Sequence, residues 1–205
     1  MAGLSEHSSM ESPRAKGISL WLMPEGDTQA RLVALVALVA RLAARLATEP
    51  FAPHVTLLPG LLGRETEVVA RAGRLARALA PFAVKLAGIE GRDEPFRCLF
   101  VRAEASAALR AAHARAARAF RRDPDPDFLP HLSLVYGTMA PERKTPLARE
   151  LDAEAPGEFE ARRLHVWRTE GNVAEWRELF VFPFGADPSQ GRPTISSETS
   201  GGSDR

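Results

Sequence analysis

The sequence predicts an α+β fold in which one structural unit is used twice. Along the chain, segments with the two-residue apolar period of strands alternate with segments of helical spacing. Residues 51–60 (FAPHVTLLPG) and 128–137 (FLPHLSLVYG) share one pattern, Phe-x-Pro-His-aliphatic-(Thr/Ser)-Leu-aliphatic-x-Gly. Each copy is preceded by the same two predicted elements, a strand and then a long helix. We therefore interpret the two decapeptides as equivalent parts of an internal repeat.

The first half begins with an alternating apolar strand that Pro24-Glu25-Gly26 ends. Leucines and valines at helical spacing then predict a helix with Asp27 or Thr28 as its N-cap. A short apolar run and a second helix, whose polar face carries arginines, complete this half. The expected elements are a strand at 18–23, a helix at about 27–48, a strand at 54–58 and a helix at 68–79.

The second half repeats this order and adds closing strands. A pair of strands surrounds Gly91-Arg92-Asp93, and an Ala/Arg-rich helix with one apolar side follows. A second pair of strands surrounds Gly171-Asn172. The expected elements are strands at 82–89 and 97–102, a helix at 104–121, a strand at 131–136, a helix at 141–152 and strands at 158–168 and 176–183.

Composition fits one soluble domain, with 205 residues, 45% hydrophobic and 26% charged. The net charge of +1 argues against non-specific duplex binding. The single cysteine, Cys98, excludes an intramolecular disulfide and any CxxC-type zinc or redox site. The longest apolar run, 32–40, is too short to span a bilayer, and the N-terminus lacks a signal-peptide core. We therefore expect a cytoplasmic or nuclear protein that makes no membrane contact.

Both ends of the chain are polar and aperiodic. Residues 1–16 and 186–205 have too few apolar side chains to offset the entropy of ordering, so we expect disordered tails. The expected folded domain is 17–185.

The repeated decapeptides place chemistry on one strand face. Successive strand residues point to opposite faces, so His54 and Thr56 project together, as do His131 and Ser133. If the halves pack about an approximate two-fold axis, two imidazoles and two hydroxyls face each other. One neutral and one protonated histidine would supply the base and the acid that phosphodiester hydrolysis needs, and the hydroxyls would donate to phosphoryl oxygens. The alternative is that the motifs are a remnant of a duplicated fold, in which these side chains only form hydrogen bonds with one another and have no function.

The tetrapeptides His54-Val55-Thr56-Leu57 and His131-Leu132-Ser133-Leu134 resemble the signature of the two-histidine (2H) phosphoesterase superfamily. Within that superfamily, the chain is most similar to the cyclic phosphodiesterases of plants and fungi. Features shared with that branch are Trp and Pro in the opening strand, residues 134–137 after the second motif, and Thr169-Glu170-Gly171 with Trp176 near the end. The resemblance covers roughly residues 17–184, but the lone cysteine departs from the plant members, which carry a disulfide.

The resemblance implies a bilobal, pseudo-two-fold domain with two lobes, in which two antiparallel sheets form a central cleft and helices pack outside. It implies metal-independent hydrolysis of ADP-ribose 1″,2″-cyclic phosphate, a step in tRNA-splicing metabolism, and of nucleoside 2′,3′-cyclic phosphates to 2′-phosphates. No cofactor and no metal are implied. The expected partner is a small cyclic phosphate, and we expect a monomer.

The resemblance also implies residue roles. His54 and His131 become the general acid and base, in an order left open, and Thr56 and Ser133 become phosphate donors. Tyr136 corresponds to a pocket-lining tyrosine. Phe96 corresponds to an aromatic that packs on substrate, and strand parity with Cys98 and Phe100 would place it at the cleft mouth. Trp21 either lines the cleft as a substrate contact or fills the sheet.

Several other residues favour structural interpretations. His113 is expected on a helix surface and His165 in a strand near the cleft. The 123–127 loop (DPDPD) lacks the spacing of known calcium loops, so we expect a solvated loop. The arginine-rich helix faces are expected to solubilise the surface or to attract a polyanionic substrate. Cys98 is expected to serve packing.

Two other functions stay open. One is a non-catalytic nucleotide-binding module on the same fold, although two complete motifs favour an enzyme. The other is a phosphodiesterase for RNA 3′ ends, as in the bacterial and archaeal branch, which would need a basic track beside the cleft.

Overall fold

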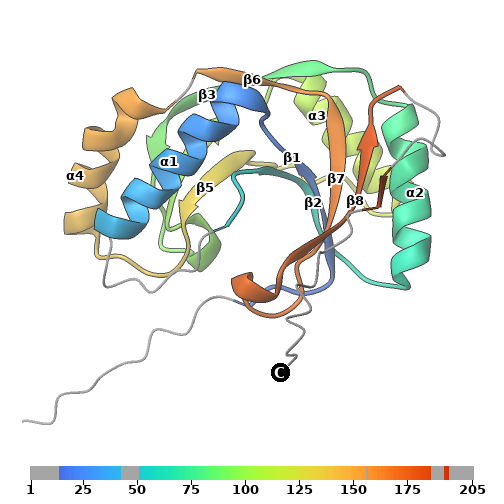
Figure 1. Cartoon of the computed structure of the whole chain (residues 1–205), viewed down its shortest axis with the longest axis horizontal. Coiled ribbons are helices and arrows are strands. Elements are labelled where there is room, and N and C mark those ends of the chain that lie inside the picture. Colours follow the sequence, from blue (N-terminus) through green and yellow to red (C-terminus); the bar gives the residue numbers. More distant parts are fainter. Residues whose placement is uncertain (1–13, 43–50, 156, 186–191, 194–205) are drawn as a thin grey trace, which may run out of the picture.

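The computed structural model describes residues 14–42, 51–155, 157–185 and 192–193 (Figure 1). Most of both expected tails lies outside these residues. Residues 14–16 of the expected N-terminal tail are described, and Ala15 and Gly171 exchange two backbone hydrogen bonds of 3.1 Å. Such an isolated bridge has no strand periodicity, so the sequence carries no signal for it. Within the expected C-terminal tail, residues 192–193 pair with an edge strand.

The described strands form one nine-stranded sheet in the order β6-β3-β4-β5-β2-β1-β7-β8-β9, and every neighbouring pair is antiparallel. This confirms the α+β fold with antiparallel strands. The strands are β1 (Ile18–Leu22), β2 (Val55–Leu61), β3 (Phe82–Glu90), β4 (Leu99–Ala103), β5 (His131–Val135), β6 (Glu158–Ala161), β7 (Arg163–Arg168), β8 (Arg177–Pro183) and β9 (Arg192–Pro193).

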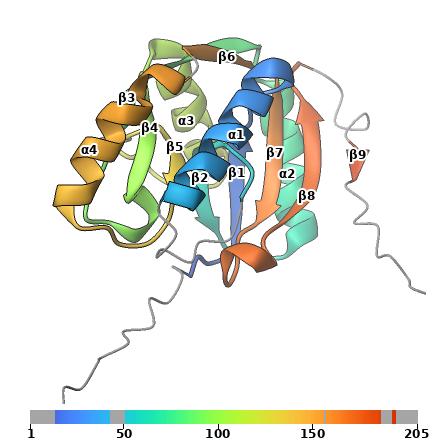
Figure 2. The same cartoon turned by 60° about the vertical axis from the view of Figure 1, so that its left-hand side comes forward.

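The order reads symmetrically outward from the β5–β2 junction. On one side, β5 is followed by β4 and β3, and on the other side β2 is followed by β1 and β7. The two halves meet through a single registered residue pair, Val55 opposite Leu132. The resemblance implies two separate sheets. The structure instead joins the two groups of strands into one curled sheet, and they meet at β5 and β2, the strands of the repeated motifs (Figure 2).

Four helices cover this sheet, α1 (Gly26–Leu42), α2 (Glu65–Arg77), α3 (Ala107–Ala119) and α4 (Pro141–Leu151). Helix α1 of the first half packs on β5 of the second, and α3 of the second half packs on β2 of the first. Helices α4 and α2 lie at opposite ends of the molecule (Figure 1). Among the described residues, no helix combines the length and apolar character that crossing a membrane requires.

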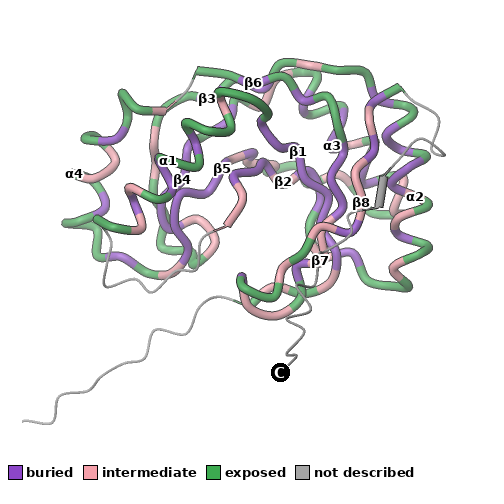
Figure 3. Tube along the Cα trace, in the orientation of Figure 1, coloured by how far each residue is buried: buried purple, intermediate pink, exposed green. Residues whose placement is uncertain are grey.

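The core follows the expected apolar positions. Val55, Leu57, Leu132 and Leu134 are fully buried behind the motif histidines, and purple segments follow the strands in Figure 3. In α2, the expected apolar face is buried. In α1, Leu32 to Val39 supply the buried face, but Leu42 is 42% exposed, and residues 43–48 of the expected helix lie outside the described chain.

The expected strand 158–168 is two strands. Residues 158–161 pair with β3, and 163–168 pair with β1 in the other half of the sheet. The interruption falls at Arg162, whose carbonyl accepts a hydrogen bond from Phe184 N instead. The sequence is strand-like throughout, so only tertiary pairing reveals that the chain changes halves here.

His113 is buried, not on the helix surface as expected. Its Nδ1 lies 2.9 Å from the Leu57 carbonyl, Asp125 N donates to its Nε2 at 3.1 Å, and its ring stacks on Phe128. Because Nε2 accepts, the proton is on Nδ1, which donates to Leu57. His113 therefore ties α3 to the strand of the first motif and holds the DPDPD loop, whose carboxylates are exposed as expected.

Candidate active site

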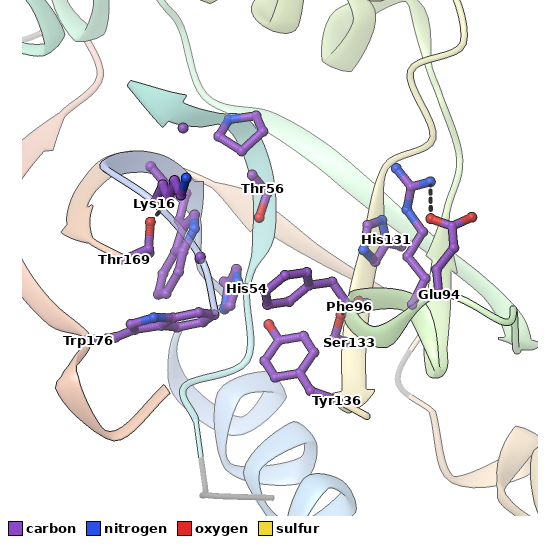
Figure 4. Close-up of a pocket in the computed structure, with 16 residues that line it drawn as sticks. Lys16, His54, Thr56, Glu94, Phe96, His131, Ser133, Tyr136, Thr169 and Trp176 are labelled. Atoms are coloured by element: carbon purple, nitrogen blue, oxygen red, sulfur yellow. Dashed lines mark hydrogen bonds and ion pairs between the residues drawn. The ribbon is translucent and has the colours of Figure 1, made fainter. Parts of the chain in front are cut away.

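Both motifs line a single pocket of about 440 Å³ between the two halves of the sheet (Figure 4). The pocket brings together every residue proposed for the site from the sequence: His54, Thr56, His131, Ser133, Tyr136, Phe96 and Trp21. A volume of this size is typical of small-molecule sites. Each motif contributes its histidine and its hydroxyl to the pocket and its two aliphatic residues to the core.

The register of β2 and β5 fixes how the motifs face each other. Val55 lies opposite Leu132, and antiparallel pairing then sets His54 across from Ser133 and Thr56 across from His131. Each imidazole is therefore opposite the hydroxyl of the other motif, on the face away from the core. A phosphate bound at the centre would meet one histidine and one hydroxyl from each side.

Both imidazoles are oriented by the backbone in the same way. His54 Nδ1 lies 2.6 Å from the Ala52 carbonyl, and His131 Nδ1 lies 2.9 Å from the Leu129 carbonyl. In each motif the acceptor is two residues before the histidine. A carbonyl accepts only from a protonated nitrogen, so the proton is on Nδ1 and Nε2 is left to exchange a proton with a ligand.

Burial lowers the pKa of both histidines, because desolvation penalises the imidazolium. For His54 it lowers the pKa to about 3, with a smaller contribution from His131, against the opposing hydrogen bond to Ala52. For His131 burial again dominates, with the guanidinium of Arg97 lowering the pKa and the carboxylate of Glu94 raising it. Both rings are therefore neutral at pH 7.

Trp21 both lines the pocket and fills the sheet. Its ring stacks on His54, with ring centroids 3.4 Å apart and planes 10° apart, and its other face stacks on Trp167 at 4.5 Å. Trp21 is 2% exposed, and its ring also meets Trp176 edge-on. The stack holds the plane of His54 and explains much of that ring's burial.

Aromatic rings form the mouth of the pocket. Phe96 and Trp176 lie nearly parallel, 24° apart with centroids separated by 6.4 Å, and Tyr136 meets both edge-on. The indole Nε1 of Trp176 is buried and has no hydrogen-bond partner among the described residues. From the sequence, Trp176 was assigned only to the closing hairpin. Its place in the pocket comes from the short 3₁₀ helix Val173–Glu175, which has no periodic signal.

Phe96 reaches the pocket by a different route from the one expected. Pro95–Arg97 form a 3₁₀ turn, so strand parity does not relate Phe96 to Cys98 and Phe100. Cys98 is packed in the core, and burial raises the pKa of its thiol. Phe100 is buried edge-on against His131. Phe96 therefore lines the pocket, but the expectation that it shares one strand face with Cys98 and Phe100 was wrong.

The loop that carries Phe96 is held at two points. The Ser133 hydroxyl donates to the Phe96 carbonyl at 3.0 Å. On the other side, the buried Lys144 ammonium donates to the Asp93 carboxylate at 2.7 Å and to the Arg92 carbonyl at 2.8 Å. These contacts fix the phenyl ring relative to the motif. The buried Tyr136 lies beside Ser133, and burial raises the pKa of its phenol.

Two cations in the pocket wall were not anticipated. Lys16 and Arg97 line the pocket, and Arg97 pairs with Glu94 at 3.0 Å. Lys16 belongs to the segment expected to be a tail. Arg97 directly follows Phe96, so the expected position of Phe96 at the cleft could have indicated that Arg97 lies nearby. Both would attract an anionic ligand.

His165 lies beside the pocket without lining it. It pairs with Trp21 across the sheet, and its Nδ1 lies 2.6 Å from Glu178 Oε1. The expected structural interpretation agrees with this buried contact. In the part of the chain that the structure describes, no group of three or more His, Cys, Asp or Glu side chains is arranged to hold a metal ion.

A symmetric antiparallel α+β fold with paired His-x-(Thr/Ser)-x motifs facing one another defines the 2H phosphoesterase class. The sequence profile of the 2′-5′ RNA ligase superfamily matches residues 34–173, so the chain belongs to this superfamily. Membership of the superfamily supports an enzyme of the phosphodiesterase type. No curated protein sequence matches the chain.

Solved structures share the fold. The chain is similar to TT0787 of Thermus thermophilus, with 25% identity and a TM-score of 0.57 over 83% of this chain and 99% of that one. It is also similar to E. coli LigT complexed with ATP (10% identity, TM-score 0.51) and with phosphate (13%, 0.52), over 84% of this chain and 99% of each LigT chain. At these identities the LigT likeness concerns the fold alone.

Proposed function

We propose that the chain is a metal-independent cyclic phosphodiesterase acting on ADP-ribose 1″,2″-cyclic phosphate and nucleoside 2′,3′-cyclic phosphates. The observation that carries the proposal is the pair of backbone-oriented imidazoles that present Nε2 to one pocket, each opposite the other motif's hydroxyl. Acid–base pairs of this kind transfer both protons of a hydrolysis. A module that only binds nucleotides would not need both.

The proposed reaction opens the cyclic diester with water. One histidine Nε2 takes a proton from a water molecule while the water oxygen forms a bond to phosphorus. The Nε2–H of the other histidine protonates the ribose oxygen while the bond between that oxygen and phosphorus breaks. The product is a phosphomonoester with a free hydroxyl, and the two histidines have exchanged protonation states. Thr56 donates to one non-bridging oxygen, where charge increases, and Ser133 turns its single proton from the Phe96 carbonyl to the other.

The unequal environments of the two histidines support a division of roles between them. His54 is stacked on Trp21 and strongly biased to the neutral form, whereas His131 is partly buried and the nearby Glu94 carboxylate raises its pKa against the effect of burial. We assign His54 as the base and His131 as the acid for ring opening. With the roles reversed, the histidine that resists protonation more strongly would have to carry the proton, and few molecules would hold the productive state.

The pocket mouth supports a substrate that carries a nucleobase. Phe96 and Trp176 present facing aromatic surfaces, and base–aromatic stacking contributes about 1–3 kcal/mol per base. Lys16 and Arg97 also line the pocket and would favour an anionic ligand. Both proposed substrates contain a base, a ribose and a cyclic phosphate.

The proposed function is tested by product analysis with three substrates in parallel. These are ADP-ribose 1″,2″-cyclic phosphate, adenosine 2′,3′-cyclic phosphate and an RNA oligomer with a cyclic 3′ end. Ring opening of either small substrate to a phosphomonoester is the expected result. Tight binding of all three without turnover would instead establish a binding module.

Chelation is expected to leave the activity unchanged. The two histidines supply both proton transfers and the hydroxyls and pocket cations bind the phosphate, so the reaction needs no metal-bound water. Turnover should be the same before and after exhaustive dialysis against EDTA. Loss of activity that Mg²⁺, Mn²⁺ or Zn²⁺ restores would overturn the mechanism.

The profile of kcat/KM against pH is expected to be a bell with both limbs below pH 6.5. A base is active above its pKa and an acid below its own, and burial lowers the pKa of His54 to about 3 and also lowers that of His131. The two limbs report macroscopic pKa values of the coupled histidine pair and do not belong to either residue alone. Bound phosphate stabilises imidazolium, so the limbs of kcat should lie at higher pH. A profile that rises continuously with pH would indicate a hydroxide mechanism without a histidine acid.

A further inference from the structure

Helices α2 and α3 pack against each other on the right-hand side of Figure 1 and form a second concave surface, of about 640 Å³. Its lining contains five arginines and no acidic residue: Arg71, Arg74, Arg115, Arg118 and Arg121. The remaining lining is apolar, from Leu75, Ala78 and Ala119. We call this surface the arginine groove.

The positive charge of the groove is concentrated and uncompensated. The whole chain has a net charge of only +1, yet residues 68–81 and 105–122 contain arginines and no aspartate or glutamate. None of the five groove arginines forms an ion pair within the described parts of the chain. In the nearest acidic run along the chain, 123–127, the three aspartates are exposed and Asp125 Oδ1 accepts a hydrogen bond from Asp127 N.

Two of the arginines are held in place by the neighbouring helix. Arg71 donates to the Ala119 carbonyl at 3.3 Å and lies over the Phe120 ring, and Arg115 donates to the Ala78 carbonyl at 2.6 Å. Each guanidinium crosses the groove to reach a helix end and keeps further donors free. Arg74, Arg118 and Arg121 complete the row.

Arg121 occupies a backbone conformation that favours glycine. It follows the C-terminal end of α3 with a φ of 58°, the only positive φ among the described non-glycine residues. The neighbouring bond from Arg122 N to the Ala117 carbonyl, 2.9 Å, is that of a left-handed helix cap, where glycine is usual. Non-glycine residues held there are strained, and such strain is concentrated at functional sites. The position therefore carries a charged side chain at the expense of stability.

The groove ends close to the catalytic pocket. Arg122, the residue after Arg121, donates to the carbonyl of Pro59 at 2.7 Å and also to that of Gly60. Pro59 and Gly60 line the catalytic pocket together with Lys16. A polyanion lying in the groove would thus reach the pocket rim at Lys16.

We propose that the arginine groove binds the sugar–phosphate backbone of a single-stranded nucleic acid. Guanidinium groups match phosphate geometry with paired donors, and a row of them contacts successive phosphates without reading sequence. The site is separate from the pocket and does not depend on the hydrolysis proposed there. It is the basic track that an RNA 3′ end would need, and DNA offers the same backbone chemistry.

The test measures binding of labelled RNA and DNA oligomers of about 12 nucleotides with ordinary 3′-hydroxyl ends, over a series of salt concentrations. The slope of log K against log salt should be about −3.5 if all five arginines contact phosphates, because each contact contributes about −0.7. The double variant Arg74→Gln/Arg118→Gln should weaken binding and bring the slope to about −2. Arg143→Gln, an exposed arginine on α4, is the matched control and should change neither.

Arg121→Gly separates binding from folding. Relief of the strained φ should raise the Tm or leave it unchanged, while oligomer affinity falls as for the loss of one contact. Turnover of a cyclic mononucleotide should be unchanged in all groove variants, and the binding assay needs no turnover, so failure of the proposed activity would be seen separately. Equal loss of affinity in Arg143→Gln, binding independent of salt, or stronger binding of an acidic peptide than of either oligomer would overturn the proposal. RNA and DNA bound equally would identify the backbone alone as the ligand, and preference for RNA would add the 2′-hydroxyl.

Discussion

His54→Ala and His131→Ala are each expected to lower kcat by at least about 10²-fold, because a general acid or base contributes about 10²- to 10⁴-fold. The double variant should be scarcely slower than the slower single variant, since one proton transfer is of little use without the other. Single-turnover rates with a cyclic nucleotide measure the effect. A single variant with near-wild-type kcat would remove that histidine from the chemistry and favour a binding module.

His113→Asn is the control for these variants. His113 is as buried as His54 and also bonds to a backbone carbonyl, but it lies outside the pocket. Its replacement should lower the Tm, because the Leu57 carbonyl and the Asp125 amide lose their partner, and should leave kcat unchanged. The opposite pattern, full stability and lost kcat, is expected at the motif histidines.

Thr56→Val and Ser133→Ala are expected to lower kcat by about 10²- to 10³-fold each, by analogy with the loss of one oxyanion donor. The two should differ in KM. Before substrate binds, the single Ser133 proton is donated to the Phe96 carbonyl, so Ser133→Ala also removes a contact that positions the Phe96 loop in the free protein and should raise KM. Steady-state kinetics with a cyclic nucleotide separate the two effects.

Neither hydroxyl titrates near neutrality, so both variants should lower the pH bell without changing its shape. Ser106→Ala is the matched control, because the Ser106 hydroxyl accepts from Leu109 N as the N-cap of α3 and does not line the pocket. It should cost about 1 kcal/mol of stability and none of the rate. A bell that disappears in Ser133→Ala would mean that this hydroxyl sets a histidine pKa.

The candidate site could be predicted from the sequence because it rests on local rules. Strand parity puts His54 with Thr56 and His131 with Ser133, and the repeat makes the two pairs equivalent, so no knowledge of distant contacts is needed. Tyr136 and Phe96 were assigned from the resemblance, and Trp21 was left open between the cleft and the sheet; all three line the pocket.

What the sequence could not predict depends on tertiary pairing. At Arg162 the chain changes from pairing with β3 to pairing with β1, inside a segment whose sequence is strand-like throughout. The isolated bridge at Ala15 lies in a segment with no apolar period. Hydrophobic periodicity therefore reveals neither feature. For the same reason Lys16 was assigned to a tail, although it lines the pocket. His113 lies at the edge of the apolar side of α3, and its burial depends on tertiary partners: the Leu57 carbonyl, the Asp125 amide and the Phe128 ring.

The most direct measurement of the central claim follows phosphorus during hydrolysis in oxygen-18 water. The protein is incubated with adenosine 2′,3′-cyclic phosphate, and ³¹P NMR reports both the product and its isotope shift. Conversion of the cyclic diester to a phosphomonoester carrying one oxygen-18, abolished in His54→Ala/His131→Ala, is the predicted result. A cyclic diester that is bound but stays intact, or that is opened equally by the double variant, would contradict the account.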